Sequence, residues 1–164
     1  MNWLGELVQE YITPIDTVLD LGCGIMNAIK DINCKSILGV DIWDKYLDEI
    51  KHLHPTIKLS MEETDRFMDK SFDVVICLDV IEHLDKQLAL KIIKECKRIC
   101  RKTAMIYTPH EFKDNIESID DSWGLGENPH QKHLCLINES DLTEENYDID
   151  NPIGEGFLGV YRNV

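Results

Sequence analysis

Short apolar, β-rich runs alternate with amphipathic stretches along this chain of 164 residues, and the alternation limits the fold more than any other feature. Strands that alternate with helices are typical of a mostly parallel sheet with helices packed on both faces. The pattern predicts seven strands, at residues 17–21, 36–40, 57–60, 72–78, 103–108, 147–150 and 157–162. It also predicts helices at residues 2–12, 25–32, 44–52, 86–100 and 140–145.

The last two predicted strands differ from the others because only the turn-rich spacer 151–156 separates them. A short spacer joins antiparallel strands in a hairpin, whereas parallel strands need a longer crossover. The sequence therefore predicts an α/β fold with one Rossmann-like, doubly wound sheet of seven strands, mostly parallel, with an antiparallel C-terminal hairpin. The length and the lack of repeats or low-complexity linkers predict a single domain over residues 1–164.

Net charge and hydropathy indicate which partners the protein binds and in which compartment it is found. The chain has 31 acidic and 17 basic residues and a net charge of −14, which disfavours nucleic acid as a partner because phosphate backbones are repelled. No run approaches the ~18 consecutive apolar residues of a membrane span, and the first ten residues lack the basic start of a secretory leader. We expect a cytoplasmic protein with no membrane association. Residues 86–102 are strongly basic, which indicates a solvated helix face or a local docking patch.

The most informative segment is a predicted buried strand that runs into the turn Gly22-Cys23-Gly24. Missing Cβ atoms let a ligand approach the backbone in such a turn. Asn27 occupies the position of the third glycine that a dinucleotide-binding loop needs, and the chain has no G-x-x-x-x-G-K-[ST] motif. These absences disfavour NAD, FAD and ATP as ligands.

A carboxylate at the end of the second predicted strand narrows the choice of ligand. Asp41 lies about 20 residues after Asp20, the spacing at which an acid binds ribose hydroxyls in this architecture. A single strand-end Asp is equally well explained as a helix cap. Together with the glycine turn, Asp41 predicts a cofactor that has a ribose but no phosphate.

With these features the chain resembles the class I S-adenosylmethionine-dependent methyltransferases, and within them the small methyltransferase type 11/12 group. The resemblance covers about residues 16–162. It rests on Val18–Gly24, Gly39–Asp41, Ser71–Leu84 and Met105–Pro109 in that order, followed by the terminal hairpin. It implies a methyltransferase with S-adenosyl-L-methionine as its cofactor.

The resemblance also assigns cofactor contacts to individual positions. It implies that Asp41 holds the ribose hydroxyls, that Ile42 lies against the adenine and that Glu62 lies near the adenine amine. In the family an acidic residue lies near the adenine amine. Counting back from the fourth strand, its expected position here is that of Met61, one residue before Glu62. Met26 stands where many members have a glycine. The other cofactor-binding residues implied are Asp20, Gly22, Cys23, Gly24 and Asp79.

Candidate catalytic residues cluster where this fold keeps its active site, at the carboxyl ends of the strands. Methyl transfer from a sulfonium demands mainly alignment of the acceptor, and a hydroxyl acceptor also needs a base or a metal. We predict Asp79, His83 and His133 as catalytic residues, with one histidine as general base. Other polar residues expected nearby are Glu82, His110 and His130.

The stretch Asp79-x-x-Glu82-His83, with the later His133, also resembles a metal-binding set. Small-RNA 3′-terminal 2′-O-methyltransferases and some quinone-biosynthesis O-methyltransferases have such a set. Asp79 stands where those families usually have Glu, and no sequence rule folds the downstream segment over Glu82. The prediction is therefore a site without metal, with metal-assisted O-methylation as the alternative.

The favoured functional hypothesis is methyl transfer to a small molecule or a sugar-containing metabolite. The chain is short and has no inserted lid, so the acceptor pocket is expected to be shallow or completed by another chain. This leaves a second hypothesis, a cofactor-binding partner or regulatory module without activity of its own. A nicotinamide oxidoreductase is a third hypothesis, which the glycine turn disfavours.

Overall fold

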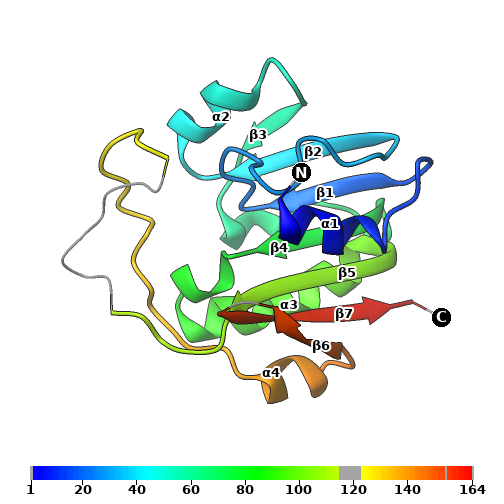
Figure 1. Ribbon diagram of the computed structural model, residues 1–164, viewed down its shortest axis with the longest axis vertical. Helices are drawn as coiled ribbons and strands as arrows, with labels where there is room; N and C mark the ends of the chain where they lie inside the picture. The colour runs from blue at the N-terminus through cyan, green and yellow to red at the C-terminus, as the bar shows by residue number, and fades with distance from the viewer. Residues whose placement is uncertain (1, 115–122, 154, 164) are drawn as a thin grey trace.

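Seven strands form one sheet in the order β3-β2-β1-β4-β5-β7-β6 (Figure 1) in the computed structural model, which describes residues 2–114, 123–153 and 155–163. Strands β1 to β5 run parallel, and β7 pairs antiparallel with both β5 and β6. This confirms the predicted fold class and its C-terminal hairpin, although Gly154 in the predicted turn lies outside the described residues. The strands are β1 (Thr17–Leu21), β2 (Ser36–Asp41), β3 (Thr56–Lys58), β4 (Phe72–Leu78), β5 (Cys100–Pro109), β6 (Asp148–Ile153) and β7 (Gly156–Arg162).

Helices cover both faces of the sheet and enclose two core clusters. Successive side chains of a strand point to opposite faces, so Val18 packs on the side of α1 and α2 while Leu19 packs on the side of α3 and α4. In the part of the chain that is described, no helix has the length and apolar character needed to cross a membrane. The helices are α1 (Trp3–Gln9), α2 (Asp44–Ile50), α3 (Lys86–Ile99) and α4 (Glu139–Thr143), with 3-10 helices η1 (Met61–Arg66) and η2 (Ile81–His83).

The predicted helix at residues 25–32 is wrong, because this segment is a series of turns. Met26 has a φ of 54°, and this left-handed conformation cannot continue a right-handed helix. The apolar spacing that suggested a helix belongs to side chains of the turns, since Met26, Ile29 and Ile32 are all buried. The glycine turn is therefore followed by further turns and not by a helix N-terminus.

Other predicted elements differ from the structure mainly at their boundaries. β5 begins at Cys100, three residues before the predicted strand, directly after the end of α3. β3 covers only Thr56–Lys58, and the residues after it enter η1, which the sequence did not predict. The capping box at Ser60 starts η1, because the Ser60 side chain accepts a backbone N–H while the Glu63 side chain reaches back to the Ser60 N–H.

The basic face of α3 is used for contacts within the chain. Its cations pair with carboxylates both on α3 and on neighbouring segments. Lys86 pairs with Asp141 on α4, Lys97 pairs with Glu145 just after α4, and Arg98 pairs with Glu95 on α3 and with Asp69 before β4. Arg101, which follows on β5, pairs with Asp73 on β4. This pairing favours the solvated helix face over the local docking patch.

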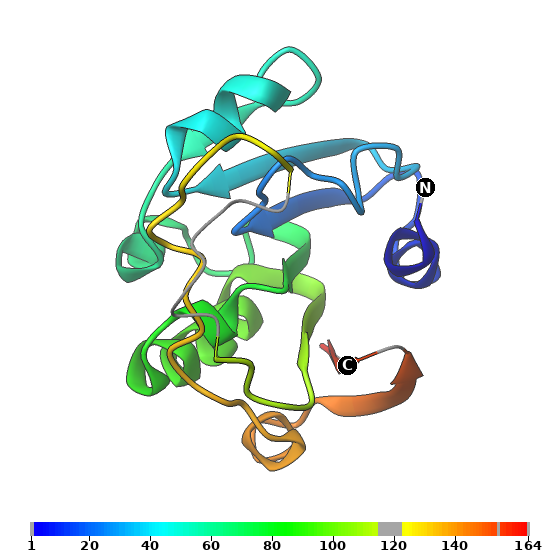
Figure 2. The ribbon, with the colours of Figure 1, turned by 60° about the vertical axis from the view of Figure 1, so that its left-hand side comes forward.

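After β5 the chain returns across the carboxyl ends of the strands. Figure 2 shows residues 123–137 passing in front of the sheet, from the region of α2 to that of α4. Lys45 Nζ on α2 donates to the Leu125 carbonyl at 3.0 Å, and Gln131 Nε2 donates to the Tyr46 hydroxyl at 3.1 Å. This returning segment covers the end of the sheet, which the sequence had predicted to lack a lid.

Candidate functional site

A cavity of about 730 Å³ lies between the carboxyl ends of the strands and the returning segment 123–137. Its volume falls within the range of about 300–1,000 Å³ that is usual for small-molecule sites. The glycine turn, the start of α1, the end of β4 and the returning segment all contribute to its wall. The predicted site residues in the wall are Asp20, Gly22, Cys23, Gly24, Asp41, Ile42, Asp79, His83 and His133.

The glycine turn is held against the end of β2 by its backbone. The Gly22 and Cys23 N–H groups both donate to the Val40 carbonyl, at 2.8 and 2.9 Å. Gly22 and Gly24 have φ values of 74° and 49°, which favour glycine. A Cβ on Gly22 would lie 2.4 Å from Val80 Cγ2, so a side chain has no room there. The turn therefore presents bare backbone to the cavity.

Asp41 links the glycine turn to the start of α2. One carboxylate oxygen accepts the Gly24 N–H and the other accepts the Trp43 N–H, both at 2.9 Å. Burial raises the pKa of Asp41 above its ordinary value, although these amides favour the charged form. Each carboxylate oxygen can accept a second hydrogen bond, so Asp41 retains acceptor capacity toward the cavity.

Asp20 is a deeply buried acid of the cavity wall, with 3% of its surface exposed, as is Glu82. Burial and the nearby Asp41 charge raise the pKa of Asp20 to about 8. Among the described residues, none donates a hydrogen bond to its carboxyl group. Asp20 therefore lacks the compensation that a buried carboxylate normally needs.

The structure does not bring every predicted residue into the cavity. Glu62 is exposed on η1 and is not part of the wall, whereas Met61, the position reached by counting, lines it. His110 is also exposed and outside the wall. Met26 lines the cavity in a left-handed conformation, which explains why glycine is suited to its position.

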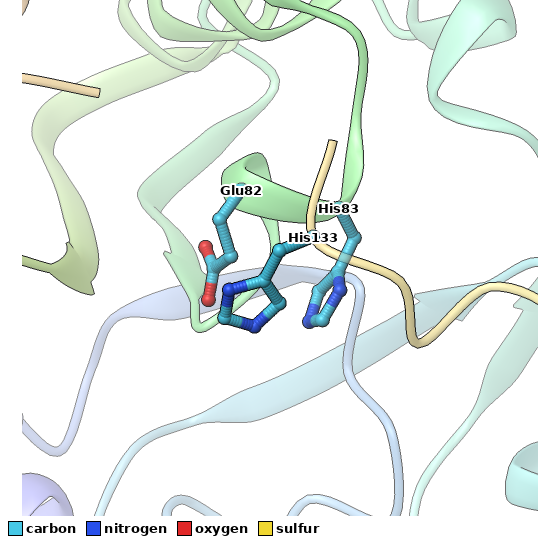
Figure 3. A group of neighbouring side chains, drawn as sticks. All are labelled: Glu82, His83 and His133. Carbon is cyan, nitrogen blue, oxygen red and sulfur yellow. The ribbon is translucent and has the colours of Figure 1, made fainter. Parts of the chain in front are cut away.

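Glu82, His83 and His133 form a compact cluster in the cavity wall (Figure 3). Potential ligand atoms of the three side chains all lie within 4.8 Å of one another, an arrangement that can hold a metal ion. The two imidazole rings pack edge to face, with centroids 4.8 Å apart. Glu82 and His83 come from η2, and His133 comes from the returning segment.

Backbone contacts fix the returning segment over Glu82. The Leu134 and Cys135 N–H groups donate to the Glu82 carbonyl, at 2.7 and 3.2 Å. His83 Nδ1 lies 3.2 Å from the Lys132 carbonyl, which can only accept, so Nδ1 carries the proton in this contact. The Nε2 atom of neutral His83 is then free of a proton. These contacts join segments about 50 residues apart, which explains why no local sequence signal predicted them.

Burial keeps the cluster largely uncharged. It raises the pKa of Glu82 to about 8, with a further contribution from the charge of Asp79. It lowers the pKa of His83 to about 4, and it also lowers the pKa of His133. Both histidines are therefore neutral at pH 7, the form that accepts hydrogen bonds and binds metals.

Asp79 ends β4 in a left-handed conformation, with a φ of 54°. Its N–H donates to the Tyr107 carbonyl at 2.9 Å, and its carboxylate is accessible from the cavity. The surrounding protein nevertheless raises the pKa of Asp79 to about 6, which Lys113 partly offsets. Asp79 does not belong to the cluster of three ligand residues.

Comparison with known protein families identifies the family of this chain. The family model described as a methyltransferase domain matches residues 19–108, which include the glycine turn, Asp41, Asp79 and the Glu82-His83 pair. The chain belongs to this family. It is a class I S-adenosylmethionine-dependent methyltransferase, as the resemblance implied.

Individual relatives agree with this assignment. The methyltransferase is 27% identical to an uncharacterized protein of Methanocaldococcus jannaschii, over 99% of this chain and 68% of that protein. It is 29% identical to a ubiquinone biosynthesis O-methyltransferase of Dechloromonas aromatica, over 55% of this chain and 42% of that protein. A solved SAM-dependent methyltransferase from Archaeoglobus fulgidus has the same fold, with a TM-score of 0.67, 16% identity, and coverage of 97% of this chain and 94% of that one.

Sequence reasoning missed several residues of the methyltransferase's cavity, chiefly aromatic ones. Trp3 on α1 packs edge to face on Tyr107, with ring centroids 5.6 Å apart. Trp123 packs on Tyr46, with centroids 5.1 Å apart, and lies next to Gly24. No local signal marks these positions, because an aromatic residue in a short helix or strand is most often part of a core.

Proposed function

We propose that this methyltransferase transfers the methyl group of S-adenosylmethionine to a small molecule, including a sugar-containing metabolite, held at the carboxyl ends of β4 and β5. The observation that carries the proposal is the shared cavity wall. One part of the wall consists of the glycine turn and Asp41, and another part consists of Glu82, His83 and His133. A cofactor at the first part and an acceptor at the second would meet in one cavity.

The residues of the first part fit S-adenosylmethionine. Asp41 has acceptor capacity for the ribose hydroxyls, and Ile42, which is 38% exposed, offers an apolar surface to the adenine. The uncompensated carboxyl of Asp20 favours the positively charged methionine end. The bare backbone of Gly22 and Gly24, together with Cys23, leaves room for close approach. Glu62 has no part in this proposal.

The bound cofactor supplies a methyl group on a positively charged sulfur, which is already a good leaving group. The protein must then align the acceptor and exclude water, and the returning segment 123–137 supports both tasks. We assign His133 as the group that accepts the proton which the acceptor's hydroxyl or amine gives up. Burial lowers the pKa of His83 to about 4, so His83 is a weak base that serves better to orient the acceptor.

The test uses methyl-labelled cofactor and a metabolite extract. Mass spectrometry should detect a labelled product, and His133→Ala should reduce its rate of formation far more than it reduces cofactor affinity. His52→Ala is the matched control, because His52 is an exposed histidine outside the cavity wall. Cofactor binding without a labelled product across a broad acceptor panel would contradict the proposal and favour the regulatory module.

Metal-assisted O-methylation is a second candidate, favoured by the geometry of Glu82, His83 and His133. The contact of His83 Nδ1 with the Lys132 carbonyl orients the ring, as a second partner usually does for a metal-binding histidine. Mixed oxygen and nitrogen ligands favour Mn, Fe, Co or Zn over Ca. Under this alternative, a chelator should abolish transfer and Mn²⁺ should restore it. Transfer that is unaffected by chelation would support the site without metal.

We propose that residues 1–164 act as one domain. We also propose a cytoplasmic location, which is supported by six free cysteines, since reducing compartments keep thiols unpaired.

A further inference from the structure

Trp3, Tyr107 and Asp79 line the same cavity as the Glu82, His83 and His133 cluster, and the charge of Asp79 acts on both Tyr107 and Glu82. Trp3 and Tyr107 pack edge to face, with ring centroids 5.6 Å apart and an interplanar angle of 71°. Asp79 is bound to the backbone of Tyr107 through its own N–H. All three residues line the cavity; Trp3 is 46% exposed, whereas Tyr107 is 5% exposed and supports the Trp3 ring from the core. An aromatic surface beside a carboxylate is a favourable environment for an organic cation.

The charge of the cavity wall favours the same kind of ligand. The acids in the wall are Asp20, Asp41, Asp79, Glu82 and Glu155. Among the described residues, the only lysine or arginine in the wall is Lys113, which is bound by Glu155. Asp20 is buried, faces the cavity and has no hydrogen-bond donor in the described part of the chain. Asp20 and Glu82 are largely protonated at pH 7 because their pKa values are about 8, so the negative charge of the wall comes from the other acids. That charge disfavours a phosphate or carboxylate on the acceptor.

We propose that the methyl acceptor carries a positively charged amine, which binds between Trp3, Tyr107 and Asp79. The inference rests on the proposed function, which places the acceptor at this end of the cavity. The amine is an anchor for the acceptor and is distinct from the atom that receives the methyl group. It places the acceptor beside the Glu82, His83 and His133 cluster.

Lys113 is the cation that such an amine would have to replace as the neighbour of Asp79. The Lys113 side chain is 54% exposed at the rim and forms its ion pair with Glu155. The pKa of Asp79 is still raised to about 6, so Lys113 compensates the Asp79 charge only in part. A bound amine that contacts Asp79 and the two rings would balance the remaining negative charge of Asp79.

The experiment compares three phenols that differ in the charge of their tail: tyramine, 4-ethylphenol and 4-hydroxyphenylacetate. Each is titrated into the protein saturated with S-adenosylhomocysteine at pH 7.5, and ligand-observed NMR gives the affinity. We expect tyramine to bind at least tenfold more tightly than 4-ethylphenol, and 4-hydroxyphenylacetate to bind most weakly. Equal affinity for tyramine and 4-hydroxyphenylacetate, or no binding of any probe, would overturn the inference.

Variants at the anchor test the assigned residues. Asp79→Asn should remove the preference for tyramine and leave 4-ethylphenol unchanged, and Asn tolerates the left-handed conformation at this position. Asp65→Asn is the matched control, because Asp65 is exposed outside the cavity wall. Trp3→Leu should weaken tyramine binding several-fold, and Trp3→Phe should restore most of it. A tyramine preference that survives Asp79→Asn would overturn the assignment.

The same titrations separate this inference from the proposed function. Binding of S-adenosylhomocysteine is measured first, without any phenol. If that binding is absent, the proposed cofactor site fails. If it is present and the probes show no preference for a cation, only the amine anchor fails.

Discussion

The pKa values of buried acids are shifted in opposite directions at the two ends of the sheet. At the amino end, Asp73 accepts hydrogen bonds from the Thr17 N–H, the Thr17 hydroxyl and Arg101. Burial acts to raise the pKa of Asp73, but these partners lower it to about 2. At the carboxyl end, burial raises the pKa values of Asp20 and Glu82 to about 8.

The difference is notable because the same strands supply both groups of acids. Asp16, which is paired with Lys102, precedes β1, and Asp20 lies near the carboxyl end of β1. Asp73 lies near the start of β4, and Asp79 directly follows its end. Buried carboxylates without partners reduce stability, whereas paired ones are tolerated. The amino end of the sheet therefore serves the stability of the fold. At the carboxyl end, Asp20 has no hydrogen-bond donor among the described residues and Glu82 accepts from the Thr108 hydroxyl, so a positively charged ligand can stabilise their ionised forms.

The largest expected effect is a loss of ligand binding when the glycine turn is filled. Gly24→Val should reduce cofactor affinity at least 100-fold, because Gly24 has a φ of 49° and an added side chain would enter the cavity next to Trp123. Isothermal titration measures the affinity, and circular dichroism checks the fold. The control is Gly124→Ala, which carries the same left-handed strain with nothing within 4 Å of the added Cβ. Normal binding by a folded Gly24→Val protein would remove the turn from the site.

Asp41→Ala should give the next largest effect. Removing a charged hydrogen-bonding group should weaken cofactor binding by about 1.5–3 kcal/mol. The loss of the hydrogen bonds from the Gly24 and Trp43 N–H groups contributes to the weaker binding, because Asp41 no longer holds the glycine turn in place. Titration of the folded variant with S-adenosylmethionine measures the effect. An unchanged dissociation constant would show that Asp41 does not contact the cofactor.

A matched pair of neutral substitutions sharpens the contrast between the two ends. Asp73→Asn should lower the free energy of unfolding by about 1–3 kcal/mol, because it removes charged hydrogen bonds to Thr17 and Arg101. Asp20→Asn should leave the stability of the ligand-free protein unchanged or raise it, because no partner is lost. Urea denaturation at pH 8 measures both. An equal loss of stability in the two variants would contradict the difference between the ends.

The pH dependence of stability gives the smallest effect. Between about pH 7 and pH 8 the two histidines of the cluster are neutral in both the folded and the unfolded chain. In this window the folded, ligand-free protein keeps protons on Asp20 and Glu82 that the unfolded chain has released. The folded state binds more protons, so the free energy of unfolding should fall as pH rises across this window. Thermal denaturation in the absence of ligand measures the slope. Asp20→Asn should make the slope shallower, and a slope of the opposite sign would contradict the assigned protonation.

Much of the fold could be predicted because periodicity and spacing are local properties. All seven strands and the long α3 follow from their apolar patterns, and the spacing of the glycine turn and Asp41 placed both at one end of the sheet. The helix at residues 25–32 failed because an apolar spacing of 3 to 4 residues fits buried turns as well as a helix. The left-handed conformation of Met26, which ends any helix there, has no signature in a non-glycine residue.

The site could be predicted only in part, because segments that are far apart in the sequence form its wall together. The sequence identified Glu82, His83 and His133 as a group but not the backbone bonds that bring His133 over Glu82. The aromatic wall depends on α1 lying against Tyr107, a tertiary contact without a local pattern. Glu62 was placed one residue too far along the chain to line the cavity.

Titration of the native protein with S-adenosylmethionine tests most directly whether the carboxyl end of the sheet is a cofactor site. Calorimetry at pH 7 in two buffers of different ionisation enthalpy measures both the binding heat and any protons released. We predict one saturable site with release of protons, because the positively charged ligand favours the ionised forms of Asp20 and Glu82. No binding heat and no thermal stabilisation at millimolar S-adenosylmethionine would contradict the assignment, since a bound ligand must stabilise the folded state.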